Sequence, residues 1–350
     1  MKVKIGELTK IKTGKLDANA ASEDGQYPFF TCSREPLKIS TYSYDCECVL
    51  VAGNGDLNVK YYNGRFDAYQ RTYIIEDNGS GNLYMPYLYY FMEAYIEELR
   101  KQAIGGVIKY IKLGNLTDAM IELPSIDEQK SIVDILEKAK KILDKRNKEI
   151  RNLDDLIKAR FVEMFGDPVD NKMGWEKKQL QEIVTDDCTI SYGIVQTGDN
   201  QKEGIPVIRP VDIVNRVPKL KELKKTTEEI SNKYKKTILK GREMLITVRA
   251  NIADTCVVDE KFKGCNVGRG IVPIRTKENI MILEFLKHLM DSKHLNDDIK
   301  NKAKGITLIQ LNMEDLREVE LIIPPIEQQK LFVEFANQVD KSKVVVASVK

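Results

Sequence analysis

One short phrase occurs twice in this chain, and its spacing limits what the chain can fold into. Residues 124–133 read PSIDEQKSIV and residues 324–333 read PPIEQQKLFV, an offset of 200 residues without a gap. The same register extends backwards over about thirty residues, so that Gly105 matches Gly305 and Leu116 matches Leu316. A period this long is far beyond that of a solenoid repeat. The sequence therefore predicts a duplicated domain whose two copies end in the same phrase.

Upstream of each phrase, short segments keep the same order in both halves. The matching pairs are 27–34 with 205–212, 46–59 with 241–258, and 66–75 with 265–274. They are rich in β-branched and aromatic residues and are bounded by Gly, Asn, Asp and Pro, which is typical of strands joined by turns. A helix-like segment follows in each copy. The expected fold class is α+β, with two similar domains of mixed β-strands and helices.

A long helix is expected directly after the first phrase. Ser125 or Asp127 can cap its start, and Gly166 followed by Pro168 ends it. Apolar residues recur along it at a seven-residue step, which is typical of a coiled-coil seam. The two apolar rows are Leu136, Leu143, Ile150, Ile157, Met164 and Ile132, Ala139, Leu153, the second interrupted by Arg146 and Arg160. About 40 residues in one helix predict a rod of roughly 60 Å.

The second phrase starts the same helix, but the sequence ends at Lys350, about fifteen residues before the first copy's helix would. Because a helix of this kind needs a partner over its seam, we expect the C-terminal helix to fold back antiparallel on the central one. Its short length predicts that Arg146 to Met164 lacks an intramolecular partner. The expected order is a domain at 1–124, a spacer helix at 125–166, a second domain at 167–324 and a short helix at 325–350.

Composition favours a soluble globular protein. A chain of 350 residues with 42% hydrophobic and 31% charged residues can bury two cores. The sequence has no apolar run long enough to span a bilayer and no signal-peptide core at its start, so we expect a cytoplasmic protein without a membrane partner. Its six cysteines form no CxxC pair and only two histidines are present, which predicts reduced, mostly buried thiols rather than a zinc site.

Charge gives a local signal only. The net charge is +2, yet residues 216–242 hold ten Lys or Arg against three Glu. Such a run is either a solvated face or a footprint for a phosphate backbone.

Enzymatic motifs are hard to find in the sequence. It has no P-loop signature and no Asn-Pro-Pro or Asp-Pro-Pro signature of adenine methyltransferases. The arrangement most like a catalytic site is Asp212 followed by Glu222 and Lys224, which resembles the acid pair of a metal-dependent nuclease. An ExK triplet is common in Lys- and Glu-rich stretches, so the sequence predicts no catalytic residues and no metal site.

The stretches ELPSIDEQKSIVDIL and LIIPPIEQQKLFVEF, each followed by helix, resemble the specificity subunits of Type I restriction–modification systems, and FDAYQRTYII resembles their target recognition domains. The resemblance covers essentially the whole chain. It implies a non-catalytic subunit in which each head reads one half of a split site in double-stranded DNA. The helices would set the distance between the half-sites and dock two methyltransferase (M) subunits, and restriction (R) subunits can join them. In the assembled complex, an adenine-N6 methyltransferase and ATP-dependent endonuclease, the partner subunits would use S-adenosylmethionine, ATP and Mg²⁺, and this chain would bind no cofactor.

The two heads share a frame but not a surface. Thirteen of the fifteen tyrosines precede residue 124, and the second head has the Lys-rich stretch instead. Unlike surfaces should read unlike bases, so we expect an asymmetric bipartite site. The alternatives are a scaffold or inhibitor that binds the modification subunit without directing it to DNA, and a nuclease built on Asp212.

Polar residues at the ends of expected strands are the candidates for DNA contact, because base edges and phosphates are bound by such side chains. They are Arg34, Asn54, Tyr61, Tyr62, Arg65 and Lys109 in the first head, and Arg209, Arg249, Asn251, Arg269, Lys304 and Thr307 in the second. The candidate docking residues on the central helix are Ile132, Leu136, Leu143, Ile150, Leu153 and Ile157.

Overall fold

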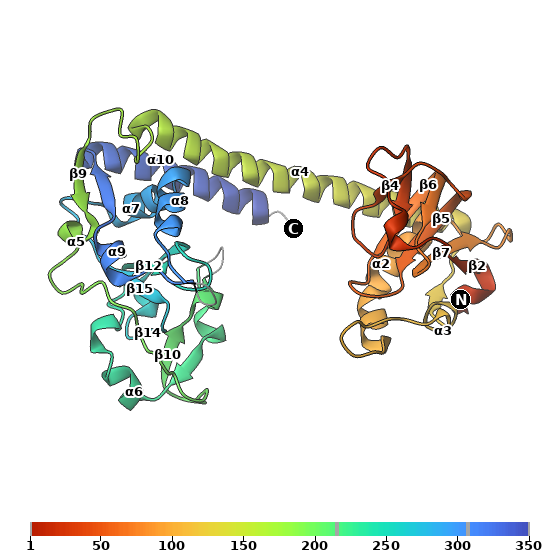
Figure 1. Cartoon of the computed structure of the whole chain (residues 1–350), viewed down its shortest axis with the longest axis horizontal. Coiled ribbons are helices and arrows are strands. Elements are labelled where there is room, and N and C mark those ends of the chain that lie inside the picture. Colours follow the sequence, from red (N-terminus) through yellow and green to blue (C-terminus); the bar gives the residue numbers. More distant parts are fainter. Residues whose placement is uncertain (1, 214–216, 306–308, 349–350) are drawn as a thin grey trace. The chain divides into compact units, whose positions relative to one another are not determined.

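The chain divides into two compact units, residues 1–145 and 146–350 (Figure 1). A computed structural model describes residues 2–213, 217–305 and 309–348. The candidate Thr307 and the start of the Lys-rich stretch at Arg216 lie outside the described residues. Each unit is described by itself below.

The first unit is built on a six-stranded sheet of order β2-β7-β5-β6-β3-β4. Its strands are β2 Thr9–Thr13, β3 Tyr27–Phe30, β4 Leu37–Ile39, β5 Tyr44–Ala52, β6 Val59–Ala68 and β7 Thr72–Asp77. All neighbours pair antiparallel except β3 and β6, which are parallel. A separate pair joins β1 (Lys2–Lys4) to β8 (Met120–Glu122), so the two ends of the unit meet.

Helices complete this unit. They are α1 Ile5–Leu8, α2 Met85–Gln102, α3 Leu113–Thr117 and the 3-10 turn η1 Ala18–Ala20. The apolar stripe of α2, with Leu88, Met92 and Leu99 fully buried, packs on the same core as Val49, Val51 and Ile75 from the sheet. Alternating residues of β5 and β7 therefore point toward α2, as expected for a sheet with one face on a helix.

The second unit repeats this topology in smaller sheets. Its strands are β9 Glu176–Gln179, β10 Ile205–Ile208, β11 Lys224–Thr226, β12 Glu243–Thr247, β13 Thr255–Val258, β14 Asn266–Val267, β15 Ile271–Ile274 and β16 Glu320–Ile323. They form the sheets β11-β10-β14, β13-β12-β15 and β16-β9. The parallel pair β10·β14 corresponds to β3·β6, and the pair β9·β16 closes this unit as β1·β8 closes the first. The duplicated α+β fold expected from the sequence is confirmed.

Some helices of the second unit also correspond to helices of the first. The helices are α5 Leu180–Ile183, α6 Glu228–Asn232, α7 Leu283–Met290, α8 Lys293–Asn301, α9 Met313–Arg317 and α10 Ile326–Ser348. The 3-10 turns are η2 Pro210–Asp212, η3 Leu220–Glu222, η4 Lys235–Thr237 and η5 Glu260–Phe262. Helix α7 corresponds to the first part of α2 and packs beside α10 (Figure 1).

The expected long helix is present as α4, Ile126–Phe165. Ser125 caps it in an S-x-x-E capping box: its Oγ accepts from the Glu128 backbone N–H at 3.4 Å, and its own backbone N–H donates to Glu128 Oε2 at 2.9 Å. Gly166 follows its last turn at φ +71°, a left-handed conformation that glycine adopts without strain.

Helix α10 runs antiparallel to the second half of α4, as expected. The rings of Phe332 and Phe161 lie 5.4 Å apart, and further along α10 Lys343 Nζ lies 2.5 Å from Asp154 Oδ1. Figure 1 shows the two helices side by side. The expectation that residues 146–164 lack an intramolecular partner is wrong, because antiparallel pairing places the first turns of α10 beside the last turns of α4.

The exposed part of the seam is instead in the first half of α4. Leu136 and Leu143 are 38% and 58% exposed, whereas Ile157 of the same row is buried, as is Phe161, against α10 and α7. The apolar face that the sequence marked as a seam is therefore half covered within the chain.

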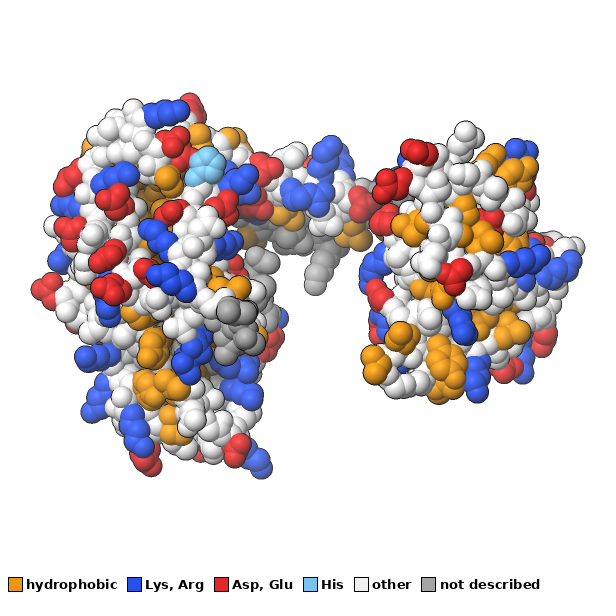
Figure 2. Space-filling view, in the orientation of Figure 1, with side chains coloured by type: hydrophobic (Ala, Val, Ile, Leu, Met, Phe, Trp, Pro, Cys, Tyr) orange, Lys and Arg blue, Asp and Glu red, His pale blue; other side chains and the backbone are white. Residues whose placement is uncertain are grey.

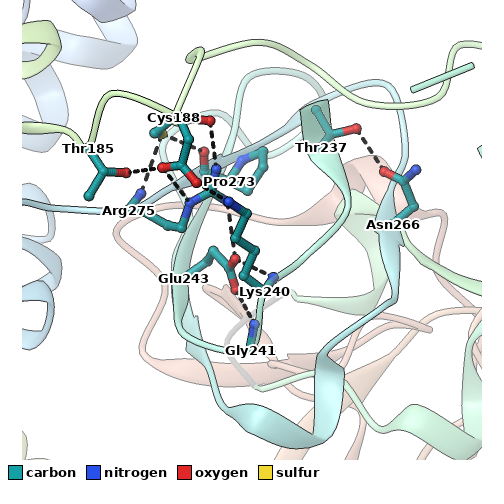
Figure 3. A network of polar contacts seen from close by, with 10 residues as sticks. Thr185, Cys188, Thr237, Lys240, Gly241, Glu243, Asn266, Pro273 and Arg275 are labelled. Atoms are coloured by element: carbon teal, nitrogen blue, oxygen red, sulfur yellow. Dashed lines mark hydrogen bonds and ion pairs between the residues drawn. The ribbon is translucent and has the colours of Figure 1, made fainter. Parts of the chain in front are cut away.

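A buried polar network organises the start of β12 in the second unit (Figure 3). The Glu243 carboxylate accepts hydrogen bonds from the backbone N–H groups of Lys240 and Gly241, at 2.6 and 3.1 Å. Arg275 Nη1 donates to the same carboxylate at 3.2 Å, and Asp187 lies on the other side of the guanidinium. Lys240 and Arg275 hold the pKa of the Asp187 carboxyl well below its ordinary value. The network fixes the turn that leads the chain into the central strand.

The six thiols are free, and four of them are buried, in agreement with the reduced cysteines expected. Burial raises the pKa of the Cys256 thiol to about 12 and that of Cys265 to about 11. Within the described residues, no helix is both long and apolar enough to cross a membrane.

Candidate nucleic-acid interface

In the second unit, Arg249 lies at the end of β12 and is held by Gln310. The backbones of these two residues form an isolated β-bridge, and a second bridge joins Lys304 to Gln310. Arg249 Nε donates to Gln310 Oε1 at 2.5 Å. The guanidinium is thus oriented by a neutral amide, so its positive charge is not offset by this partner.

Two further candidate arginines lie beside Arg249. Gly270 separates Arg249 from the turn that follows Arg209: a Cβ at position 270 would lie 3.1 Å from both Arg249 Cβ and Pro210 Cγ. The backbone N–H of Gly268 donates to Ile208 O at 2.8 Å, which places Arg269 next to the same turn. The structure therefore brings Arg209, Arg249, Arg269 and Lys304 to one region of this unit, which we call the arginine surface.

These arginines differ in whether the positive charge is paired with a carboxylate. Arg209 forms a two-bond pair with Asp212, Nε to Oδ2 at 3.0 Å and Nη2 to Oδ1 at 2.9 Å. Arg269 is exposed and follows the buried β14 strand. Arg249 combines a fixed orientation with a guanidinium that forms no ion pair among the described residues, and bidentate recognition of a base edge needs this combination.

The turn that holds Asn251 is strained. Ala250 and Ala253 adopt φ of +61° and +65°, a left-handed conformation that costs a residue with a Cβ of order 1 kcal/mol or more. Thr247 Oγ1 donates to the Asn251 carbonyl and accepts from the Asp254 N–H at 3.0 Å, which holds the turn closed. Asn251 is exposed on this turn, adjacent to Arg249.

The first unit repeats the bridge with different side chains. Asn54 pairs with Tyr110, and Ile104 pairs with the same tyrosine, as Arg249 and Lys304 pair with Gln310. The backbone N–H of Gly55 donates to Lys109 O at 2.9 Å, so Asn54 and Lys109 are neighbours. Val107 and Ile108 lie between Ile104 and Tyr110 in the chain and form an exposed apolar tip.

Arg34 joins this region through Asp56. Its Nε lies 2.9 Å from Asp56 Oδ2, and Arg100 Nη2 lies 3.2 Å from the other carboxylate oxygen. Arg34, with a smaller contribution from Arg100, lowers the pKa of the Asp56 carboxyl. A cleft of about 420 Å³ opens beside this ion pair, against α2.

The other candidates of the first unit lie on β6, in local pairs. Tyr61 Oη donates to Glu47 Oε1 at 2.7 Å, and burial, reinforced by Glu47, raises the pKa of Tyr61. Arg65 Nε lies 3.0 Å from Asp45 Oδ2. Tyr62 packs its ring 5.1 Å from that of Phe30, so this side chain belongs largely to the core.

The Lys-rich stretch spans η3, β11, α6 and η4, and several of its lysines are paired. Lys219 bonds Glu222 and Lys233 bonds Glu229, both at 3.0 Å. Tyr192, Tyr234 and Lys235 line a cleft of about 300 Å³. On the face shown in Figure 2, basic and acidic side chains are interspersed over this unit.

Asp212 of the nuclease-like arrangement makes its hydrogen bonds within its own turn. Both oxygens of Asp212 accept from Arg209, and the Arg209 backbone N–H also donates to Oδ2 at 2.8 Å. Across the described ranges, no cluster of three His, Cys, Asp or Glu could hold a metal ion. Asp212 thus closes the turn after β10.

The candidate docking residues are divided between two environments. Ile132, Leu136 and Leu143 are exposed, and Ile150 is half-buried. Leu153 packs against the core of the second unit and Ile157 is buried in it. Only the first three offer an apolar face to another molecule.

The sequence did not identify Gln310, Tyr110 and Arg100 as parts of these surfaces. A usable signal was present for two of them, because the 200-residue offset aligns Tyr110 with Gln310 at the bridge position. A duplicated position with unlike polar residues marks a surface that has diverged. Arg100 gave no such signal, since its contact with Asp56 joins residues far apart in the chain.

The comparisons with known proteins concern the family and the fold of the chain. The family model described as Type I restriction modification DNA specificity domain matches residues 1–152 and 172–345. The EcoDI specificity subunit of a Type I restriction enzyme from Escherichia coli is 44% identical over 135 residues, which cover 39% of this chain and 30% of that protein. The EcoBI specificity subunit, also from E. coli, is 23% identical over 275 residues, 72% of this chain and 58% of that protein. The matches thus span less than two thirds of either relative.

A solved S subunit of a Type I restriction–modification system from M. genitalium has a similar fold. Its TM-score is 0.57 at 14% identity, with 100% of this chain and 93% of that chain covered. The family model covers nearly all of the chain, in two matches that correspond to the two units with their duplicated topology. The chain therefore belongs to the family of Type I restriction modification DNA specificity domains.

Proposed function

We propose that this chain is a non-catalytic DNA-specificity subunit that recognises an asymmetric bipartite site. The observation that carries the proposal is the duplicated bridge, with Asn54 and Tyr110 in one unit and Arg249 and Gln310 in the other. Recognition of two unlike half-sites requires two units with the same backbone fold and unlike side chains at the same position. Each unit would read one half-site.

Arg249 is the strongest candidate for reading a base. An arginine presents two parallel N–H donors to O6 and N7 of guanine in the major groove, and such a contact discriminates bases by about 1–3 kcal/mol. The bond to Gln310 uses Nε, and among the described residues neither Nη group is in a hydrogen bond, so both can face a ligand. Arg269, Lys304 and Lys109 are exposed cations suited to phosphate contacts, which position the protein without reading sequence.

Replacing Arg249 by alanine should change the DNA sequence that is preferred. The measurement is selection of random duplexes by the full chain, followed by affinities for the selected site and for its single-base variants. Wild type should enrich two short unlike halves at a fixed separation. Arg249→Ala should bind the selected site about 5- to 100-fold more weakly and lose preference at one base pair in one half.

The matched control is Lys263→Ala, an exposed cation on the turn after η5. It should leave the selected sequence unchanged. Failure of the wild-type chain to enrich any sequence would contradict the proposed function. An unchanged preference in Arg249→Ala would remove Arg249 from the readout while leaving the function in place.

The proposal includes partners. Two methyltransferase subunits would dock along the helical part of the chain, restriction subunits could join them, and S-adenosylmethionine, ATP and Mg²⁺ would be bound by those subunits. The exposed residues Ile132, Leu136 and Leu143 of α4 support a docking face there. A scaffold or inhibitor would use the same face without directing methylation to a sequence.

Polar substitutions on this face should weaken the partner complex. Burial of one leucine contributes about 1.5–3 kcal/mol, so Leu136→Asn together with Leu143→Asn should reduce affinity for a methyltransferase subunit at least tenfold. Glu137→Asn with Asp144→Asn is the control, because it places the same residue type one position further along the helix. Sedimentation or titration calorimetry measures the complex. Equal affinity of the two double variants would show that docking uses another surface.

A further inference from the structure

The repeated phrase contains one fully buried polar side chain, Gln129 in the first copy and Gln329 in the second, each with 0% exposure. Gln129 Oε1 accepts from the backbone N–H of Tyr84 at 2.8 Å. Its Nε2 donates to the carbonyl oxygens of Asn82 and Pro124, at 2.9 and 3.0 Å. The amide thus ties the first turn of α4 to two other segments of its unit.

Gln329 makes the same three bonds in the second unit. Its Oε1 accepts from the backbone N–H of Ile282 at 3.0 Å, and its Nε2 donates to the carbonyls of Ile280 and Pro324, at 3.0 and 2.8 Å. Tyr84 and Ile282 are the N-cap residues of α2 and α7. The helix cap next to each glutamine is not shared, because Ser125 and Glu128 correspond to Pro325 and Gln328. The three-bond glutamine is therefore a feature that the two copies have kept.

These hydrogen bonds fix the direction in which each helix leaves its unit. Each glutamine joins the start of one helix to the start of another and to the short link that follows β8 or β16. Tilting the helix away from the unit would break bonds of a buried amide, and each buried polar group left without a partner costs about 1–3 kcal/mol. Loss of any one of the three bonds would leave a buried polar group without a partner. The bonds therefore hold the outgoing helix at one angle to its unit.

A small change in that angle has a large effect at a distance. The 40 residues of α4 give a helix of roughly 60 Å. A tilt of about 10° at its start moves its far end by about 10 Å, which corresponds to about three base-pair steps at ~3.4 Å each.

We propose that Gln129 and Gln329 are the joints that fix the angles of α4 and α10 to their units and so set the separation of the two DNA half-sites, Gln129 directly and Gln329 through the packing of α10 on α4. This inference rests on the proposed function. It assigns the glutamines a positioning role, in which they touch no DNA and determine how far apart two readers bind.

The test measures the preferred separation of the two half-sites independently of the affinity for each half-site. Full-chain wild type, Gln129→Met and Gln329→Met are titrated with duplexes carrying the selected site at its own spacer length and at one base pair shorter or longer, and with each half-site alone. Methionine keeps the volume and loses all three bonds. We expect the preference of wild type for its own spacer to fall at least fivefold in each variant, with affinity for the isolated half-sites within twofold of wild type.

Gln338→Met, an exposed position on α10, is the matched control and should keep the wild-type spacer profile. Circular dichroism confirms that each variant is folded. If Gln129→Met does not fold, Gln129→Asn replaces it, since the shorter side chain keeps an amide at this position and cannot span all three bonds. Folded variants with an unchanged spacer preference would contradict the proposed positioning role of the glutamines. Variants that lose half-site binding as well would also contradict it. A wild-type chain that prefers no split site would instead contradict the proposed function.

Discussion

Phe332→Ala should lower the free energy of unfolding of the second unit by about 3–5 kcal/mol, the usual effect of truncating a fully buried phenylalanine. The Phe332 side chain has 0% exposure and lies at the centre of an aromatic cluster. Its ring is 5.4, 5.7 and 6.1 Å from those of Phe161, Phe165 and Phe285. The substitution would leave a cavity where α10 meets α4 and α7, so both the core and the helix pair would lose contacts.

Trp175 makes this measurement specific. It is the chain's one tryptophan, it belongs to the second unit, and its ring lies 6.3 Å from that of Phe165. Urea unfolding followed by its fluorescence therefore reports this unit. Leu331→Ala is the control, because Leu331 is 61% exposed on the same helix and should change stability by less than about 0.5 kcal/mol. A change of under about 1 kcal/mol in Phe332→Ala would mean that α10 is not part of the cooperative core.

Glu243→Ala should destabilise the same unit by a similar amount, about 3–5 kcal/mol, for an electrostatic reason. The Glu243 side chain has 0% exposure and Arg275 has 11%. Removing the carboxylate leaves Arg275 Nη1 and the N–H groups of Lys240 and Gly241 without their acceptor, while the rest of the guanidinium keeps its contacts with Asp187. The loss of one partner from a buried pair is costly because the other charge stays buried.

The same fluorescence assay measures this effect. Glu203→Ala, at an exposed loop position, is the control and should be nearly neutral. Glu243→Gln should fall between the two, because it keeps an oxygen acceptor and loses the charge. If Glu243→Ala costs no more than Glu203→Ala, the network in Figure 3 does not stabilise the folded unit.

The sequence predicted the fold well where periodicity decided it. The duplicated phrase, the apolar rows of α4 and the turn-bounded strands gave the two-domain α+β architecture and the antiparallel helix pair. It failed on which half of α4 is covered. That depends on where the two helices meet, and the contact of Phe332 with Phe161 fixes their register in a way that no seven-residue pattern encodes.

The candidate interface was predicted less evenly. Asn54 and Arg249 were chosen as turn residues, and the structure places them at equivalent bridges. Tyr62 was chosen by the same criterion and is half-buried, because β6 directs its ring toward Phe30 at the edge of the core. Gln310 was missed because its bond to Arg249 joins residues 61 positions apart. Whether a turn residue faces solvent or core is decided by such tertiary contacts.

The strand pairs that close the two units have a consequence for how such a chain can evolve. In each unit the first strand pairs with the strand that precedes the outgoing helix, at β1·β8 and β9·β16. Ile5 N–H bonds Ala119 O at 2.9 Å, and Leu180 N–H bonds Val319 O at 3.0 Å. Entry and exit of each unit are therefore neighbours in space. A recombination event that exchanges the coding segment between them would replace a whole unit and leave both junctions, and the helix beyond them, as they were.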